Sequence, residues 1–374
     1  MKNESDNLTR RKFMRDGAMV SAGLASGIVP MAVNELNAAQ LAEISRTRSY
    51  NPQMEYRRLG KTGLWISAVS LGGHWKRIDK IIGSVDSFAS CENMGSPSRE
   101  DMAAFDKNRY DVVSRCIDVG INLVDFAGCV EPEAYGRALK GRRESMYTAW
   151  SLGGQDMRHP EHRKAPVLID LLKDGLKRTG LEYADIWRIM MLERGSRHTE
   201  GEVHELIRAL ETARKQGLCR FTGISTHDRT WAKMLIEKYP DAIEVLLTPY
   251  TADSRELPKD SLFATVRKHD VGILGIKPFA SNSLFKGNGS PDSPHAEEDD
   301  RRAQMAIRHI LSNPAITAPI PGLVSIHQVN NMAKAIKQRR RLDMNEKAQL
   351  KKATDEMWAN LPDDYTWLND WKYV

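Results

Sequence analysis

Short apolar runs alternate with amphipathic segments along most of this 374-residue chain. Continuous apolar strands that alternate with helices favour a parallel sheet, because helices then cover both faces of every strand. Seven runs read as strands, at 121–126, 145–152, 185–192, 221–226, 245–250, 272–279 and 316–322. An earlier run that ends at Leu71 makes eight. Eight such units in about 280 residues predict a closed (β/α)8 TIM barrel.

The segments between these runs include two clear helices. In 165–180 the residues Leu168, Leu171, Leu172 and Leu176 fall on one face, and 201–217 has the same periodicity with Gly217 as its stop. An open, doubly wound sheet is the alternative architecture. It would carry a GxGxxG turn after an early strand, and no such motif follows one in this sequence. The closed barrel is therefore the prediction.

The first fifty residues have a different character. Arg10 and Arg11 stand shortly before Phe13, and a mildly apolar stretch follows at 17–33. A charged segment before an apolar one is typical of a twin-arginine export signal, and this run is too short for a stable membrane anchor. We predict a signal peptide at 1–39, a linker at 40–53 and export to the periplasm by the twin-arginine translocation machinery. A chance arginine pair in a disordered tail is the alternative.

Charge and cysteine content exclude several classes of function. The formal charge of +6 (55 basic minus 49 acidic residues) is modest, and the one dense basic run, 337–341, is better explained as a solvated helix end. We therefore expect no nucleic-acid partner. The four cysteines are far apart in the sequence and form no metal-binding motif, so no metal site is predicted.

The rest of the chain divides into a barrel and a C-terminal extension. Residues 54–342 hold the barrel, which opens with a β-hairpin around Gly60 and Gly63. Residues 76–108 form a polar insertion too long for an ordinary βα loop, and we expect a lid rather than disorder. Residues 343–374 hold a helix and an aromatic tail, YTWLNDWKYV. We expect the tail to pack against a helix; the alternative is a sugar-binding wall at the barrel mouth.

Active sites of such barrels lie at the carboxyl ends of the strands. Asp125 stands at the end of the apolar run INLVDF and would point into the mouth of the barrel. A buried carboxylate is costly unless a partner compensates its charge. Asp125 is therefore a candidate functional residue.

Several motifs resemble the aldo/keto reductase family in order and spacing. They are RRLGKTGLWISAVSLGG, GINLVDFA, YGRALKG, TGLEYADIW, GLCRFTGIST, GILGIKPF and PIPG followed by QVNN, and they span 54–335. The resemblance implies a (β/α)8 barrel that binds an extended nicotinamide cofactor. It also implies hydride transfer to or from a carbonyl carbon.

The same resemblance implies an aspartate, a tyrosine, a lysine and a histidine at the site. Asp125 matches the aspartate, whereas Val130, Trp150 and Met190 stand where the other three are expected. The set is thus degenerate, and Asp125 needs a new partner. Candidate partners are His74, Glu131, Glu133, Arg188, His227 and the 76–108 insertion. We predict Asp125 and His74 as catalytic residues, because an imidazole beyond a strand end exchanges protons near neutral pH.

The cofactor side resembles the family more closely. The resemblance implies that Gly72 and Gly73 approach the nicotinamide and that Ser225 and Thr226 hold its carboxamide, with Leu247 in place of the usual glutamine. Lys277 would meet the pyrophosphate or remain a solvated strand-end lysine. The adenosine phosphate end would be held by Gly322, Ser325, Gln328 and Asn331, with a helix that starts at Ser325. NADP is weakly preferred over NAD.

Three functional hypotheses follow. The first is an oxidoreductase that acts on a carbonyl or hydroxylated, sugar-like small molecule with a non-standard proton donor. The second is a catalytically inactive binding or structural protein on the same barrel, because a fold does not fix a function. The weakest is a lyase that uses Lys277 as a Schiff-base amine.

Overall fold

The computed structural model describes residues 37–84, 88, 95–128, 130–151 and 156–374. The predicted signal peptide lies almost wholly outside the described residues, as do Cys91 and Cys129. Among the described helices, none is long and apolar enough to cross a membrane.

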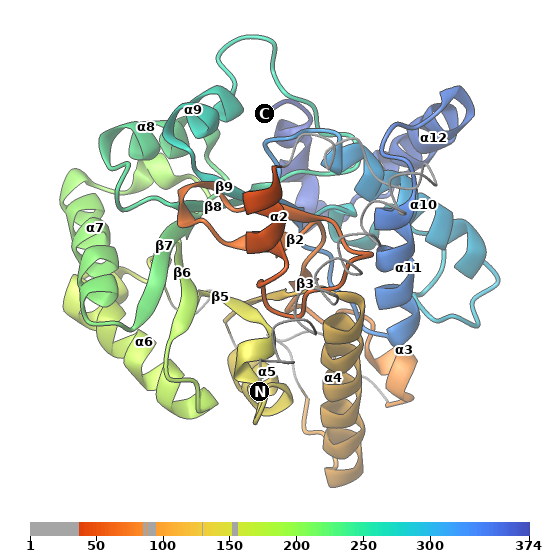
Figure 1. Ribbon diagram of the computed structural model, residues 1–374, viewed down its shortest axis with the longest axis horizontal. Helices are drawn as coiled ribbons and strands as arrows, with labels where there is room; N and C mark the ends of the chain where they lie inside the picture. The colour runs from red at the N-terminus through yellow and green to blue at the C-terminus, as the bar shows by residue number, and fades with distance from the viewer. Residues whose placement is uncertain (1–36, 85–87, 89–94, 129, 152–155) are drawn as a thin grey trace, which may run out of the picture.

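Eight parallel strands form the centre of the molecule (Figure 1). They are β3 (Leu71–Gly72), β4 (Leu123–Ala127), β5 (Tyr147–Ser151), β6 (Ala184–Met190), β7 (Cys219–Ser225), β8 (Val245–Pro249), β9 (Gly272–Ile276) and β10 (Ala318–Pro319). Sequential strands are neighbours throughout. A parallel bridge between Gly72 and Gly322, with the Gly72 amide donating to the Pro321 carbonyl at 2.8 Å, joins the first strand to the last. The predicted (β/α)8 barrel is therefore confirmed.

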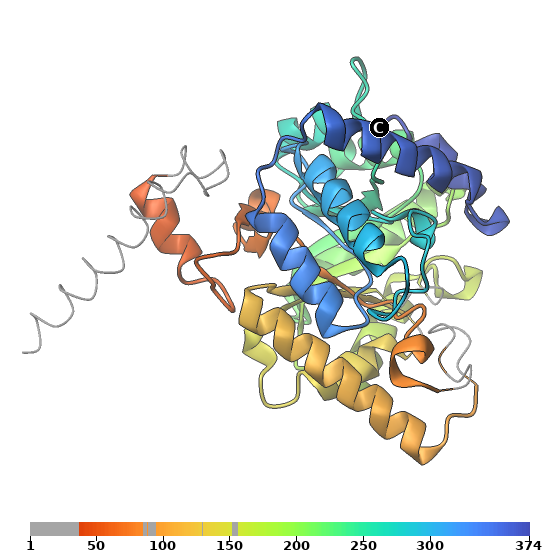
Figure 2. The ribbon, with the colours of Figure 1, turned by 90° about the vertical axis from the view of Figure 1, so that its right-hand side faces the viewer.

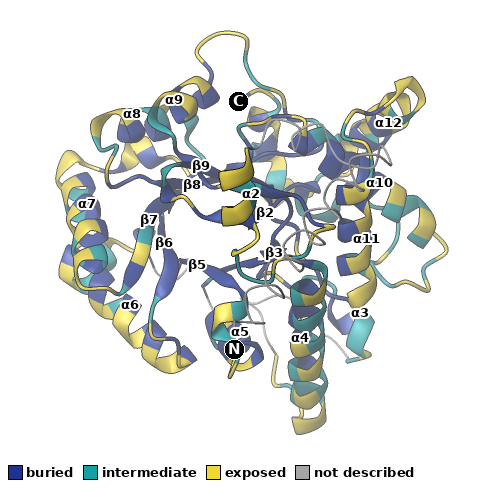
Figure 3. Ribbon diagram, viewed as in Figure 1, coloured by how far each residue is buried: buried dark blue, intermediate teal, exposed yellow. Residues whose placement is uncertain are grey.

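Helices surround this sheet, and their buried faces point inward (Figure 3). They are α4 (Arg99–Val119), α5 (Glu131–Ala138), α6 (Ala165–Thr179), α7 (Glu200–Lys215), α8 (Arg229–Lys238), α9 (Leu262–His269), α10 (Ala296–Leu311) and α11 (Ile326–Lys337). Both predicted helices are present as α6 and α7. Leu168, Leu172 and Leu176 are buried as expected, whereas Leu171 is only partly buried at the edge of that face. The C-terminal helix α12 (Met344–Ala359) lies against α10 (Figure 2).

The predicted hairpin is formed by β1 (Tyr56–Arg58) and β2 (Trp65–Ser67), which pair antiparallel around the short turn Gly60–Thr62. Leu59, Leu64 and Ile66 are buried with the inward-facing residues of the barrel strands. The hairpin therefore completes the hydrophobic interior of the barrel.

Side-chain alternation along β5 corrects one expectation. Trp150 packs in the outer layer, between the sheet and the helices, with its ring centroid 5.4 Å from that of Phe126. Ala149, the preceding residue, packs in the barrel interior. Successive strand residues face opposite sides, so the position that faces inward at the end of β5 is Ser151. Trp150 therefore does not stand at the mouth.

The 76–108 insertion is only partly a loop. Residues 99–108 are the first half of α4, which begins with a capping box between Ser98 and Asp101. The short helix α3 (Asp79–Ile82) precedes it. Buried aromatic residues of the insertion, Phe88 and Phe105, stack with ring centroids 4.6 Å apart and pack with Trp75 beside α5. The lid role stays a prediction.

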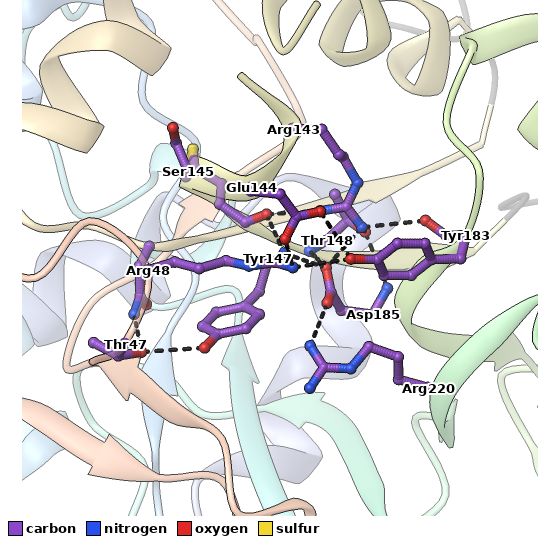
Figure 4. Close-up of polar contacts among 12 residues, drawn as sticks. Thr47, Arg48, Arg143, Glu144, Ser145, Tyr147, Thr148, Tyr183, Asp185 and Arg220 are labelled. Atoms are coloured by element: carbon purple, nitrogen blue, oxygen red, sulfur yellow. Dashed lines mark hydrogen bonds and ion pairs between the residues drawn. The ribbon is translucent and has the colours of Figure 1, made fainter. Parts of the chain in front are cut away.

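The segment predicted as a linker, 40–53, begins in helix α2 (Ala38–Ile44) and then contacts the barrel. Figure 2 shows α2 projecting from the barrel. The Thr47 hydroxyl donates to the Trp65 carbonyl at 2.7 Å, and the Ser49 hydroxyl donates to the Ser145 carbonyl at 2.7 Å. Arg48 reaches the buried Asp185 at the amino end of β6 (Figure 4).

Candidate active site

A cavity of about 440 Å³ opens at the carboxyl ends of the strands. Eight of the residues predicted from the sequence line it together: Gly72, Gly73, His74, Asp125, Ser225, Thr226, Lys277 and Gly322. Gln328 and Asn331 line an adjoining cavity of about 70 Å³, and Ser325 lines neither. The two cavities share Lys76, Phe279, Asn282 and Gly322. They therefore form one path from the mouth toward α11.

Arg188 is the partner of Asp125. Its Nε and Nη2 donate to the same carboxylate oxygen, at 2.7 and 2.6 Å, and both residues are buried. Burial raises the pKa of Asp125 above its ordinary value, against the opposing effect of Arg188. The sequence signal for this pair is an arginine at an inward-facing position of the apolar run DIWRIMM.

His74 forms a second pair with Glu131. Its Nδ1 contacts Glu131 Oε1, while Glu131 Oε2 accepts the Ala127 amide at 2.8 Å. Glu131 is fully buried, whereas 46% of the His74 side chain is exposed. The Glu131 carboxylate holds the pKa of His74 above its ordinary value, although burial acts in the opposite direction.

Gly73 makes room for this second pair. A Cβ atom at Gly73 would overlap Glu131 Oε2 and lie 2.7 Å from the backbone oxygen of Asp125. Real Cβ atoms do not approach that closely, so a side chain at this position would displace the carboxylate. Gly72 is similarly restricted, because its Cβ would lie 2.7 Å from the Pro321 carbonyl.

Two positions where the family resemblance implies catalytic residues carry apolar side chains near the mouth. Met190 lines the cavity, and Val130 is exposed directly before α5. Glu131, the next residue, brings its carboxylate into the cavity wall instead. Glu133, the other candidate on α5, does not line the cavity and binds Arg178 at 2.7 Å.

The wall opposite His74 contains the residues expected on the cofactor side. Ser225 and Thr226 follow each other at the end of β7, and Leu247 of β8 lies beside them. Lys277 begins a strained loop in which Lys277, Ala280, Ser281 and Asn282 all have positive φ. Such strain in residues other than glycine is typical of functional loops.

The C-terminal tail contacts helices, as expected, through Trp371 against α8 and Lys372 against α12, and it also reaches the mouth. Residues Asp363–Trp371 form a short 3-10 segment in which Asp364, Tyr365 and Trp367 line the cavity. Trp367 stacks on His227 with ring centroids 3.9 Å apart. The sequence shows the aromatic content of the tail but not its direction.

Tyr365 is held by two lysines at this rim. Lys76 Nζ donates to its hydroxyl at 3.1 Å, and Lys277 Nζ lies 5.0 Å from its ring centroid. Burial would raise the pKa of Tyr365, but Lys277, Lys76 and a hydrogen bond with Ser281 together lower it to about 8. The tail thus places an easily ionised phenol in the mouth.

The far end of the path is formed by α11, which begins after Ser325 as predicted. The Ser325 hydroxyl caps this helix by accepting the Gln328 amide at 3.2 Å. Gln328 accepts the Val324 amide at 2.8 Å, and Asn331 donates to the Asp300 carbonyl at 3.2 Å. Among the described residues, no cluster of histidine, cysteine or acidic side chains could hold a metal ion.

Comparisons with known proteins agree on one family. The sequence profile described as "Aldo/keto reductase family" matches residues 95–355. L-Galactose dehydrogenase of Arabidopsis thaliana is 24% identical over 322 residues, which cover 79% of this chain and 92% of that protein. L-Glyceraldehyde 3-phosphate reductase of Escherichia coli (strain K12) is 24% identical over 299 residues, covering 75% and 76%.

Solved structures support the same fold. An aldo-keto reductase from Bacillus halodurans in its holo form has a TM-score of 0.57 and 20% identity, covering 80% of this chain and 96% of that one. An aldo-keto reductase from Klebsiella pneumoniae in complex with NADPH has a TM-score of 0.57 and 19% identity, covering 80% and 94%.

Proposed function

Because this chain belongs to the aldo/keto reductase family, we propose that it is an oxidoreductase that uses a nicotinamide cofactor on a carbonyl or hydroxyl group of a sugar-like small molecule. One observation carries the proposal. A single cavity contains both the residues expected on the cofactor side, such as Ser225 and Lys277, and two proton-exchanging candidates, His74 and Asp125.

The residues along the path fit a dinucleotide. Ser225 and Thr226 would hold the carboxamide, and Gly72 would allow the nicotinamide to approach the backbone. Lys277 lines the cavity beside the Tyr365 ring, and its ammonium group would bind a pyrophosphate there. Gln328 and Asn331 lie where the adenosine end would reach. When bound, the dinucleotide supplies or accepts the hydride; NADP is the slightly preferred form.

The chain's own groups would handle the proton. His74 Nδ1 is occupied by Glu131, so Nε2 is the nitrogen available to the cavity. In a reduction, Nε2 would give its proton to the substrate oxygen as negative charge develops there. Asp125, held by Arg188, would accept a hydrogen bond from a substrate hydroxyl. The proton donor is thus not the tyrosine that the family resemblance implies.

A sugar-like substrate is favoured by two observations. The similar proteins include one named for L-galactose and one named for L-glyceraldehyde 3-phosphate. In addition, Trp367 and Tyr365 line the cavity, and aromatic faces suit the C–H surfaces of sugars.

We further propose that the protein is exported to the periplasm by the twin-arginine translocation machinery. Support comes from the Arg10–Arg11 pair and the apolar stretch that follows it. This route moves folded proteins, which suits an enzyme that acquires its cofactor before export.

The alternative function is a catalytically inactive binding protein. Val130 and Met190 motivate it, because neither side chain transfers protons. Turnover of a carbonyl compound that is lost on substitution of His74 or Asp125 would exclude this alternative.

Dinucleotide binding is the first testable prediction. Native mass spectrometry of the purified protein is expected to show a retained dinucleotide, or one captured from added NADPH or NADH, because the path matches an extended cofactor. Lys277→Ala should weaken this binding by about tenfold, since it removes one charge-assisted contact. The matched control is Lys233→Ala, because Lys233 pairs with Asp260 and does not line the cavity. Protein that carries and captures no dinucleotide would contradict the proposal.

A further inference from the structure

We propose that Glu131 is a positioning residue that makes His74 the proton donor of this site, so that the His74–Glu131 pair replaces the tyrosine absent at Val130. The inference rests on the proposed function and goes beyond it by assigning a role to a residue that no family motif marks. Its basis is the contact between His74 Nδ1 and Glu131 Oε1 inside the cavity wall.

Glu131 is fixed at both carboxylate oxygens. Oε2 accepts the Ala127 amide at 2.8 Å, and Oε1 contacts the imidazole. The side chain is fully buried, so it has no freedom to turn toward solvent. A carboxylate that accepts the Nδ1 proton fixes the tautomer of a histidine and the direction of its ring. His74 Nε2 is therefore held toward the cavity.

The backbone around this pair is built to accept it. Glu131 is the first residue of α5, and an acidic side chain is favoured at a helix N-terminus. Gly73 leaves the space that the carboxylate fills. Because Glu131 directly follows Val130, its carboxylate enters the mouth from the same turn that would carry the family's tyrosine. The carboxylate thus has a place prepared by two separate segments, the end of β3 at Gly73 and the turn that starts α5.

The charges that face His74 favour the protonated imidazole. Glu131 of α5 and Asp125 of β4 stabilise the positive charge, whereas Lys277 at the end of β9 opposes it. Among the described residues whose charges act on His74, removal of Glu131 would leave Asp125 to oppose Lys277, and Asp125 is itself bound to Arg188. The pKa of His74 should then fall.

Proton transfer from His74 accompanies hydride transfer to the carbonyl carbon. In reduction, the carbonyl carbon gains the hydride and the C=O π bond breaks toward oxygen. That oxygen takes the proton from His74 Nε2, which leaves a neutral imidazole whose Nδ1–H stays on Glu131. The carbonyl compound is reduced and the nicotinamide is oxidised; alcohol oxidation is the same sequence in reverse.

The test compares Glu131→Gln with Glu133→Gln. Both residues are on α5, but Glu133 binds Arg178 of α6 and does not line the cavity. The measurements are the pH profile of kcat for NADPH-dependent reduction of glyceraldehyde and the titration of His74 by NMR. The wild-type rate should fall as the pH rises through the pKa of His74, because the donor is then deprotonated.

Glu131→Gln is expected to shift this fall to lower pH and to lower the His74 pKa in the NMR titration. It should also reduce kcat by about tenfold, with little change in KM. This loss is smaller than the 10²–10⁴-fold loss typical when the general acid itself is removed. Glu131→Asp keeps the negative charge but moves it away from the imidazole, so its kcat and its His74 pKa should lie between those of Glu131→Gln and the wild type. Glu133→Gln should match the wild type.

Two outcomes would overturn the inference in distinguishable ways. If the wild type reduces glyceraldehyde and Glu131→Gln keeps its rate and pH profile, Glu131 has no such role and the proposed function stands. If the wild type binds no dinucleotide and reduces no carbonyl probe, both proposals fail. If Glu131→Gln does not fold, Glu131→Asp provides the comparison.

Discussion

Replacement of His74 by alanine is expected to lower kcat for carbonyl reduction by about 10²–10⁴-fold, the usual contribution of a general acid. His74 combines three properties that the reaction requires: it lines the cavity, 46% of its side chain is exposed, and Glu131 keeps its pKa above the ordinary value. Dinucleotide affinity should change little, because the polar side chains expected to hold the dinucleotide, such as Ser225 and Lys277, lie at the ends of β7 and β9. Steady-state kinetics and cofactor titration measure the two effects separately.

His204→Ala is the control, since His204 is exposed on α7, outside the mouth. A His74→Ala variant that keeps wild-type kcat would place the donor elsewhere. Tyr365 would then be the next residue to test, because its hydroxyl faces the same cavity and its pKa is lowered to about 8. Tyr365→Phe would distinguish the two groups.

The barrel could be predicted from the sequence because its signal is periodic and repeated. Each apolar run and each amphipathic stretch supports the same architecture, so an error in one element does not change the fold. The helix within the 76–108 insertion has a weaker sequence signal. Residues 99–108 carry few apolar side chains, and the capping box at Ser98 and Asp101 is the one clear sign of the helix that starts there.

Trp150 shows why the sequence does not settle which of two neighbouring residues at a strand end faces the barrel interior. A shift of one position along a strand moves a side chain to the opposite face of the sheet. YTAWS gives no alternation between polar and apolar residues, so the sequence does not indicate which residues face inward. The structure places Ala149 inside and Trp150 outside.

The partners within the site depend on contacts between distant segments. Arg188 meets Asp125 across the barrel, and Glu131 meets His74 across 57 residues of sequence. Both partners were among the candidates, but no local pattern ranks them. The tail is similar: its contacts with residues distant in the sequence, such as the stacking of Trp367 on His227, place it at the mouth.

The opposite end of the barrel contains a buried cluster of ion pairs. Asp185, at the start of β6, is fully buried and binds three arginines at 2.8–2.9 Å: Arg48 from the N-terminal segment, Arg143 and Arg220 (Figure 4). It also accepts the Thr148 amide at 3.0 Å. Residues at the amino ends of barrel strands usually serve stability. This cluster ties the N-terminal segment to three strands.

Asp185→Ala is therefore expected to lower the free energy of unfolding by about 3–5 kcal/mol, the range for removing one partner of a buried ion pair. The loss arises because three guanidinium groups lose their shared counter-charge and the Thr148 amide loses its acceptor. Urea denaturation measures it as a lower midpoint. Asp355→Ala is the matched control: its ion pair with Lys351 on α12 is more than half exposed, so its loss should cost no more than about 1 kcal/mol. Equal losses for the two variants would show that the cluster has no special role in stability.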